Sequence, residues 1–242
     1  PGEDENQNDA QGKERDMLLL EHIYKTYYVG DEVVHALDDA SLHVKPKEFV
    51  AICGPSGSGK TTLMNVMGCL DLPDSGRYLL DGVNIADCTD QQLSLIRSEK
   101  IGFVFQQFNL LDSMSALENV ELPLVVSGVS PKEARQRAQA ALERVGLRAQ
   151  GEKRPAQLSG GQRQRVTIAR SLVNNPEIVW ADEPTGALDS RTADDIITLM
   201  ETLNEDQGLT FVIVTHDAAV GARCHRIIHM VDGAIVREER LR

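Results

Sequence analysis

Apolar and polar residues alternate at short spacing in two stretches near the start of the chain. These stretches, residues 18–28 (LLLEHIYKTYY) and 33–44 (VVHALDDASLHV), flank the short sequence VGDE. Such patterning on both sides of a turn predicts two strands of an antiparallel sheet. A further hairpin is expected at residues 74–85 (DSGRYLLDGVNI), with its turn at Asp81-Gly82.

The pattern then changes to that of a parallel α/β unit. Residues 48–53 (EFVAIC) are a short apolar run, followed by glycines and by the helical pattern TTLMNVMGCL at residues 61–70. Strand, glycine-rich loop and helix are the first parts of such a unit. From about residue 112 to 158 helical patterning dominates and strand signals vanish. We therefore expect a helical subdomain inserted into the α/β core.

One helix of this subdomain has clear boundary signals, in the sequence SPKEARQRAQAALERVGL. Ser130 and Glu133 predict a capping box, Pro131 occupies the first helical position, and Gly146 predicts the end. The helix is expected to pack on one face only, because its apolar stripe is narrow. The stripe consists of Ala134, Ala138, Ala141, Leu142 and Val145.

Two strand–helix units and a hairpin complete the chain. The apolar runs EIVWADE (177–183) and TFVIVTH (210–216) each precede a helical segment, and residues 226–239 predict a hairpin that turns at Asp232-Gly233. This order predicts one α/β domain over residues 17–242. Its expected parts are a parallel core sheet, an N-terminal antiparallel β-subdomain and the inserted helical subdomain.

Composition narrows the possible functions. The chain has 242 residues, 41% of them hydrophobic, which is enough for one substantial core. Its formal net charge of −12 argues against nucleic-acid binding, because neutralising phosphates needs clustered Lys and Arg. No apolar run reaches the roughly 18 residues that a membrane-spanning helix needs.

The start of the chain and the cysteines bear on location. Residues 1–16 are polar and net acidic, without the apolar segment of a signal peptide, so we expect a disordered tail. The four cysteines are scattered and show neither CxxC pairs nor zinc spacing, which indicates thiols in a reducing cytosol. A cytoplasmic location is therefore expected, and any connection to a membrane would come through a partner.

The first strong chemical signal is GPSGSGKT at residues 54–61, which fits G-x-x-x-x-G-K-[ST] between a predicted strand and helix. Its glycines let backbone N–H groups face phosphate oxygens. Lys60 supplies charge for the β- and γ-phosphates, and the Thr61 hydroxyl is placed to bind Mg²⁺. The predicted nucleotide-binding residues here are Gly54, Ser56, Gly57, Ser58, Gly59, Lys60, Thr61 and Thr62.

A second signal follows the strand of residues 177–181, which ends in Asp182 and Glu183. A carboxylate at the tip of a buried strand commonly serves the metal of such a site, usually through water. Glu183 is then close enough to the γ-phosphate to polarise an attacking water. The alternative is that the two acids only begin a turn before Pro184.

Together these motifs resemble those of the ATP-binding subunits of ABC transporters, over almost the whole chain from residue 17. GPSGSGKT is similar to the Walker A motif, EIVWADE to Walker B, LSGGQ (158–162) to the signature and GALD (186–189) to the D-loop. The resemblance implies a P-loop NTPase fold that binds ATP and Mg²⁺ and hydrolyses ATP. GCLDLPDSG, IGFVFQQFNLL and ADEPTGALDS resemble the lipoprotein-release and macrolide-export branch, which implies a separate membrane permease as partner.

The resemblance also assigns roles to single residues. Tyr27 would stack on adenine, with Tyr28 as the alternative, although either could be a plain strand residue. Gln106 would bind the metal and sense a partner, with Gln107 as the alternative. His216 would contact the γ-phosphate, although a histidine at a strand end can also be a core residue. The implied catalytic residues are Glu183, His216 and Gln106, and the implied metal ligands are Thr61, Gln106 and Asp182.

The signature has no nucleophile or metal cluster, so its role is implied by the family alone. Glycines that open a helix can hold a γ-phosphate through N–H groups and the helix dipole. The residues implied to act on the nucleotide of a second copy are Ser159, Gly160, Gly161, Gln162 and Asp189. The alternatives are a helix cap or turn, for Asp189 as well, or closure on the same chain.

Two other functions are compatible with a phosphate loop: a non-transport ABC ATPase, and a nucleotide-sensing module without turnover.

Overall fold

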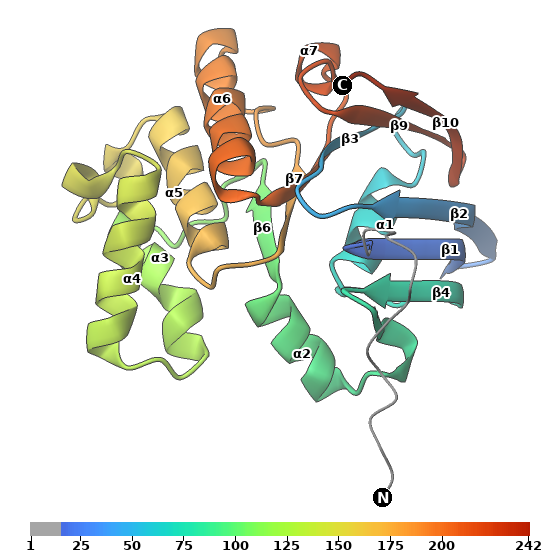
Figure 1. Cartoon of the computed structure of the whole chain (residues 1–242), viewed down its shortest axis with the longest axis horizontal. Coiled ribbons are helices and arrows are strands. Elements are labelled where there is room, and N and C mark those ends of the chain that lie inside the picture. Colours follow the sequence, from blue (N-terminus) through green and yellow to red (C-terminus); the bar gives the residue numbers. More distant parts are fainter. Residues whose placement is uncertain (1–15) are drawn as a thin grey trace, which may run out of the picture.

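A six-stranded sheet runs through the middle of the molecule, in the order β10-β9-β3-β8-β7-β6 (Figure 1). Four neighbouring strands are parallel, β9 continues the parallel pairing beside β3, and β10 pairs antiparallel with β9. The predicted parallel core sheet is therefore confirmed. The strands are β3 (Phe49–Cys53), β6 (Ile101–Phe105), β7 (Ile178–Asp182), β8 (Thr210–Val214), β9 (Arg226–Val231) and β10 (Ala234–Arg240).

The structure, a computed structural model, describes residues 16–242. The acidic tail predicted for residues 1–16 lies outside this range except for Asp16, whose carboxylate is hydrogen-bonded to Nδ1 of His43 at 3.2 Å. In residues 16–242 no helix is long and apolar enough to cross a membrane.

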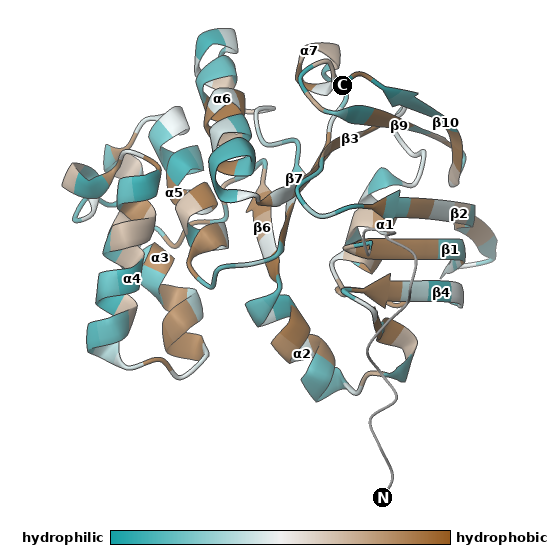
Figure 2. Ribbon diagram, viewed as in Figure 1, coloured by the Kyte–Doolittle hydropathy of each residue, from teal (hydrophilic) through white to brown (hydrophobic). Residues whose placement is uncertain are grey.

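Successive residues of the central strands face opposite sides of the sheet. Phe49 and Ala51 of β3 belong to one buried apolar cluster, whereas Val50 and Ile52 belong to another. The strands of a parallel sheet are covered on both faces, so their interior positions need apolar residues. Figure 2 shows this as brown ribbon along the central strands. The sheet therefore separates two cores.

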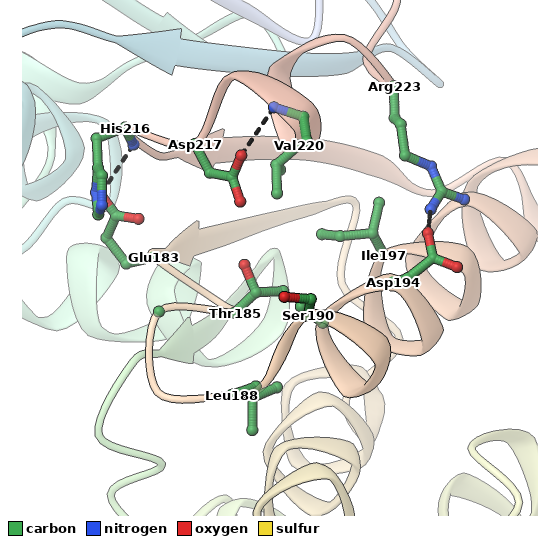
Figure 3. A pocket seen from close by; sticks show the side chains of 13 residues that line it. Glu183, Thr185, Leu188, Ser190, Asp194, Ile197, His216, Asp217, Val220 and Arg223 are labelled. Atoms are coloured by element: carbon green, nitrogen blue, oxygen red, sulfur yellow. Dashed lines mark hydrogen bonds and ion pairs between the residues drawn. The ribbon is translucent and has the colours of Figure 1, made fainter.

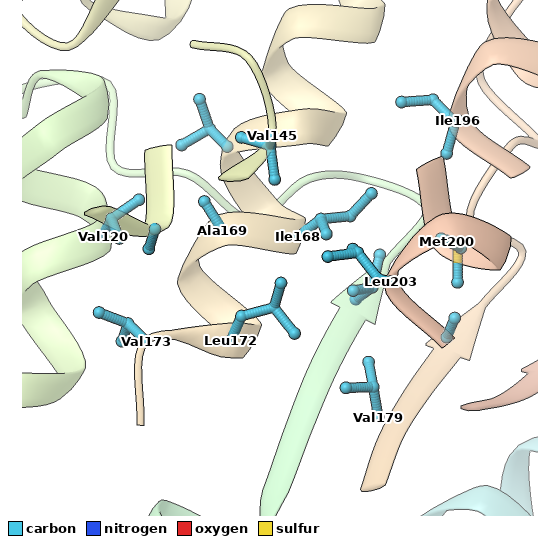
Figure 4. Packing of buried hydrophobic residues seen from close by; sticks show 14 of the residues in the cluster. Val120, Val145, Ile168, Ala169, Leu172, Val173, Val179, Ile196, Met200 and Leu203 are labelled. Carbon is cyan, nitrogen blue, oxygen red and sulfur yellow. The ribbon is translucent and has the colours of Figure 1, made fainter. Parts of the chain in front are cut away.

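Helices cover one face of this sheet. All five residues of the predicted α4 stripe are buried there, as expected for one-sided packing. In Figure 4, Val120, Ile168 and Met200 come from three different helices, and they belong to one buried cluster that also includes Val179 of β7. The longer helices of this layer are α3 (Ala116–Val126), α4 (Pro131–Arg144), α5 (Gly160–Leu172) and α6 (Ser190–Gln207), with short turns η2 (Arg148–Gln150) and η3 (Pro155–Gln157).

The other face packs against helix α1 (Lys60–Met67) and a second sheet, in the order β2-β1-β4-β5. The antiparallel pairing predicted for the first two strands is confirmed, and the turns at Asp81-Gly82 and Asp232-Gly233 have positive φ at both residues. Positive φ at both central residues is what a two-residue type I′ hairpin requires. The strands are β1 (Leu18–Val29), β2 (Glu32–Val44), β4 (Ser75–Leu80) and β5 (Val83–Asn84), after which η1 (Ile85–Asp87) follows.

The structure corrects three details. Helix α1 ends at Met67 rather than at residue 70, because Gly68 caps it and Cys69 adopts a φ of 54°. Helix α2 (Asp90–Glu99) was not predicted, although Thr89 and Gln92 form a full capping box. Its weak apolar pattern explains this, since only Leu93 is buried. At the start of α4 the described contacts include the Ser130 cap but not the reciprocal bond of a capping box.

Trp180 of β7 is the only tryptophan of the chain and is fully buried in the core beside α1. No hydrogen-bond partner for its indole N–H is found among the described residues. A buried N–H without a partner costs free energy. The apolar contacts of the ring must therefore offset this cost.

We predict that Trp180→Ala lowers the free energy of unfolding by about 3 kcal/mol, at the lower end of the range for large buried aromatics. The cavity is destabilising, while loss of the unpaired N–H offsets part of that cost. Urea denaturation followed by circular dichroism measures the difference. The control is Val236→Ala, at a side chain that is 60% exposed, for which a change below about 0.5 kcal/mol is expected. Equal stability of both variants would contradict this account of the core.

Candidate functional site

Polar and charged side chains follow four neighbouring strands at one edge of the central sheet. Lys60 follows β3, Gln106 follows β6, Asp182 and Glu183 end β7, and His216 follows β8. Because these strands are parallel, their carboxyl ends meet at the same edge. The predicted catalytic and phosphate-binding residues are thereby brought to one edge of the sheet.

The phosphate loop depends on glycines for both conformation and space. Gly57 and Gly59 have φ values of 79° and 95°. A Cβ on Gly59 would lie 2.3 Å from the carbonyl oxygen of Ala36, and one on Gly54 would lie 2.3 Å from that of Met230. Lys60 begins α1. Its Nζ donates to the carbonyl oxygens of Gly54 and Pro55, at 2.8 Å each.

The phosphate loop and Tyr27 share a pocket of about 380 Å³. Tyr27 is half-buried and lines it, whereas the neighbouring Tyr28 is 78% exposed and is not among its lining residues. Of the two tyrosines, Tyr27 is thus the one placed beside Lys60. The lining residues are Tyr27, Val34, His35, Ala36, Gly57, Gly59, Lys60, Thr61, Thr62 and Asp232. Ser56 lies exposed in the same loop, and Ser58 is buried.

Glu183 and His216 contact each other directly (Figure 3). One carboxylate oxygen of Glu183 lies 2.6 Å from Nδ1 of His216 and accepts the His216 backbone N–H at 3.0 Å. The other accepts the hydroxyl of the buried Thr215 at 3.2 Å. Glu183 itself has a φ of 45°, a left-handed backbone that non-glycine residues adopt rarely. The end of β8 thus fixes the Glu183 carboxylate.

This contact changes the acid–base behaviour of His216. The hydrogen bond to Glu183 and the charge of that carboxylate raise the pKa of the imidazole above its ordinary value. Since the His216 side chain is 76% exposed, solvent screens part of this interaction. His216 lines a cavity of about 430 Å³ whose other lining residues include Asp217, Asp194 and Arg223 (Figure 3).

Asp182 lies at the carboxyl end of β7, beside Glu183. Burial first, and then the charge of Glu183, raise the pKa of Asp182, while Lys60 lowers it. The predicted metal-binding set of Thr61, Gln106 and Asp182 offers hydroxyl, amide and carboxylate oxygens, the ligands that Mg²⁺ prefers. In the described part of the chain no three His, Cys, Asp or Glu side chains are grouped to hold a metal.

The segment after Gln106 is held by two arginines that the sequence did not single out. The Gln106 side chain is packed so closely on Gly186 that a Cβ there would lie 2.6 Å from Nε2; Gln107 is exposed. Phe108 and Asn109 both have positive φ, and Arg170 of α5 donates to both of their carbonyl oxygens. The Arg163 guanidinium lies 5.0 Å from the centre of the Phe108 ring. Helix α5 thus fixes this segment, as only the fold could show.

The signature opens α5 and lies against the D-loop. Ser159 and Gln162 close a capping box there. A Cβ on Gly161 would lie 2.5 Å from the methyl group of Thr192, and one on Gly160 would lie 3.1 Å from Leu188. Asp189 caps α6 and accepts the hydroxyl of Thr192 at 2.6 Å, which lowers the pKa of Asp189. Neither of the two cavities described above is lined by signature residues.

Comparison with known proteins decides the family. A family model described as ABC transporter matches residues 37–186, which is more than half of the chain. The chain belongs to the ABC transporter family. Its motif order and its two-sheet fold are those of an ABC ATPase cassette, and the resemblance seen in the sequence is confirmed.

Two relatives illustrate the range of this family. The chain is 50% identical over 230 residues to the uncharacterized ABC transporter ATP-binding protein MJ0796 of Methanocaldococcus jannaschii, covering 93% of this chain and 98% of that protein. It is 51% identical over 225 residues to the macrolide export ATP-binding/permease protein MacB of Syntrophobacter fumaroxidans. This match covers 92% of this chain but only 32% of that relative.

A solved structure matches the fold closely. It is a dimeric structure of a post-hydrolysis state of the MJ0796 cassette bound to ADP and Pi, with a TM-score of 0.85 and 49% identity. The match covers 93% of this chain and 99% of that one. A further dimeric structure of MJ0796 matches with the same TM-score. Nucleotide binding and the P-loop ABC ATPase fold are thereby established for this chain.

We predict that His216 titrates above the usual histidine pKa of about 6.5 and that Glu183→Gln lowers this pKa. A raised pKa means that the charged pair is complete below the ordinary pKa and is lost as the pH rises through the raised one. A pH series of histidine NMR signals measures it, with His216→Gln to assign the resonance. The same His216 titration in the wild type and in Glu183→Gln would contradict the contact.

Proposed function

We propose that this chain is the ATP-hydrolysing subunit of an ABC transporter, cytoplasmic and attached to the inner face of the membrane through a separate permease. The observation that carries the proposal is the edge of the sheet where the phosphate loop, Asp182 and the Glu183–His216 pair meet. Polar side chains that could hold a triphosphate and activate water lie there at the ends of neighbouring strands.

The proposed roles follow from position. Lys60 and the N–H groups of the phosphate loop bind the triphosphate, and Tyr27 stacks on the base. Glu183 polarises the attacking water, while His216 and Gln106 contact the γ-phosphate side. Mg²⁺ held by Thr61, Gln106 and Asp182 would neutralise developing charge on the phosphates.

A second copy of the chain completes the site in this proposal. The signature opens α5 in the helical layer, whereas α1 and the phosphate loop belong to the other side of the sheet (Figure 1). Ser159, Gly160, Gly161, Gln162 and Asp189 would therefore act on the nucleotide of the partner copy. The dimeric structures of MJ0796 support this arrangement. ATP would then join the two copies, and hydrolysis would release them.

A groove of about 470 Å³ beside β6, α3 and α5 supports docking of a permease. Its walls include the apolar Phe103, Leu122 and Val126. It also contains Arg97 and Arg170 but no Asp or Glu; the hydrogen-bond acceptors of both guanidiniums are neutral, namely backbone carbonyl oxygens and the Ser94 hydroxyl. On a chain with a net charge of −12, such a groove fits an apolar segment that carries a carboxylate. Motif resemblance favours export, lipoprotein release or mechanical work on the envelope.

The first test is Glu183→Gln. If Glu183 is the water-polarising base, hydrolysis should fall by about 100-fold or more, while ATP binding is retained. ATP should then produce a stable dimer in size-exclusion chromatography. Lys60→Ala is the comparison variant, and it should lose ATP affinity and form no dimer. A Glu183→Gln monomer with full turnover would overturn both the dimer and the assignment of Glu183.

The second test concerns the groove. Val126 is 79% exposed at the end of α3, and we expect Val126→Asp to weaken association with the permease by about tenfold. ATP turnover of the isolated chain should stay unchanged. The control, Val236→Asp, changes an exposed valine on β10. Equal co-purification of both variants with the permease would place the docking surface elsewhere.

A further inference from the structure

The Tyr27 ring is held by a residue of the loop that follows α1. Its hydroxyl donates to Oδ2 of Asp71 at 2.7 Å. The other carboxylate oxygen of Asp71 accepts from Nζ of Lys25 at 2.8 Å, and the same ammonium lies 5.4 Å from the centre of the Tyr27 ring. Tyr27 is therefore contacted both at its hydroxyl and by a cation near the ring, within one cluster of three side chains.

The cluster is charged and partly shielded from solvent. The Lys25 side chain is only 12% exposed and that of Asp71 is 32% exposed. Burial alone would raise the pKa of Asp71, but the hydrogen bonds from Lys25 and Tyr27 outweigh it and lower that pKa. The carboxylate is thus charged at neutral pH, and charge-assisted hydrogen bonds are stronger than neutral ones.

The loop that carries Asp71 is itself fixed at several points. The Asp71 N–H donates to the carbonyl oxygen of Asn65 in α1 at 3.2 Å. Nζ of Lys25 also donates to the carbonyl oxygen of Leu72 at 2.8 Å. Further along, Asp74 accepts the backbone N–H of Thr26 at 2.7 Å. Asp71 therefore reaches Tyr27 from a segment anchored to both α1 and β1.

We propose that Asp71, together with Lys25, is a positioning residue that holds the Tyr27 ring as a preformed platform for the base of the nucleotide. This inference rests on the proposed function. A ring already fixed in one orientation loses little conformational freedom when a base stacks on it, so more of the stacking energy becomes affinity. The hydroxyl of Tyr27 is essential to this device, and phenylalanine cannot replace it fully.

The contact of Asp71 and Lys25 with Tyr27 should affect binding of the base and not of the phosphates. A general structural role would affect both. Asp71 is not among the residues lining the pocket that contains Tyr27 and Lys60. Weakening the cluster should therefore reduce affinity for ATP but not for inorganic tripolyphosphate, which lacks a base. It should also raise KM for ATP and leave kcat unchanged.

The experiment compares binding of Mg²⁺–ATP and Mg²⁺–tripolyphosphate by calorimetry in Asp71→Asn and Tyr27→Phe. Each variant should bind ATP about 3- to 10-fold more weakly, with tripolyphosphate affinity changed by less than about twofold. The double variant should lose no more ATP affinity than the single variant that binds ATP less tightly, because both changes break the same hydrogen bond. Asp87→Asn is the control, since Asp87 pairs with Asn84 instead.

Three results would overturn the inference. They are unchanged ATP affinity in Asp71→Asn, an equal loss for ATP and tripolyphosphate, and fully additive losses in the double variant. Failure of the proposed function would be seen differently. In that case Lys60→Ala would bind both ligands as the wild type does, whatever the Asp71 variants show.

Discussion

A parallel sheet that is buried on both faces is the constraint on which this structure depends. The interior positions of β3, β7 and β8 must be apolar, because each face packs on a separate core. Polar residues are excluded from the strands and can appear only where the strands end. The parallel direction gathers these ends at one edge. The place of Lys60, Asp182, Glu183 and His216 thus follows from burial as much as from chemistry.

The two faces of the sheet also divide the functional motifs. The phosphate loop opens α1, which packs with the antiparallel sheet, whereas the signature opens α5 in the helical layer. Contacts across the divide are made by loops. Arg170 of α5 holds the carbonyl oxygens of Phe108 and Asn109, next to Gln106 at the end of β6. A movement of α5 would therefore reach the strand-end cluster through this segment.

The sequence predicted the fold class, the hairpins that turn at Asp81-Gly82 and Asp232-Gly233, and the buried stripe of α4, because these depend on local patterns. It missed α2, whose apolar pattern is weak, although Thr89 and Gln92 were a usable signal. It also placed the phosphate loop between the right elements. Pairings between distant residues were out of its reach. Glu183 meets His216 across 33 positions, and Tyr27 meets Asp71 across 44. Such pairs depend on how β1, α1, β7 and β8 are stacked.

Helix α1 connects the phosphate loop to the residue that contacts Tyr27. Its first residue is Lys60, and the loop after its last residue, Met67, carries Asp71. Eight helical residues span about 12 Å, and they form a single rigid segment whose buried face includes Leu63, Met64, Val66 and Met67. A helix packed this firmly sets the distance between the charge at the phosphates and the contact that orients Tyr27. In the proposed site, the affinity for the base and that for the triphosphate would therefore depend on different residues on one support.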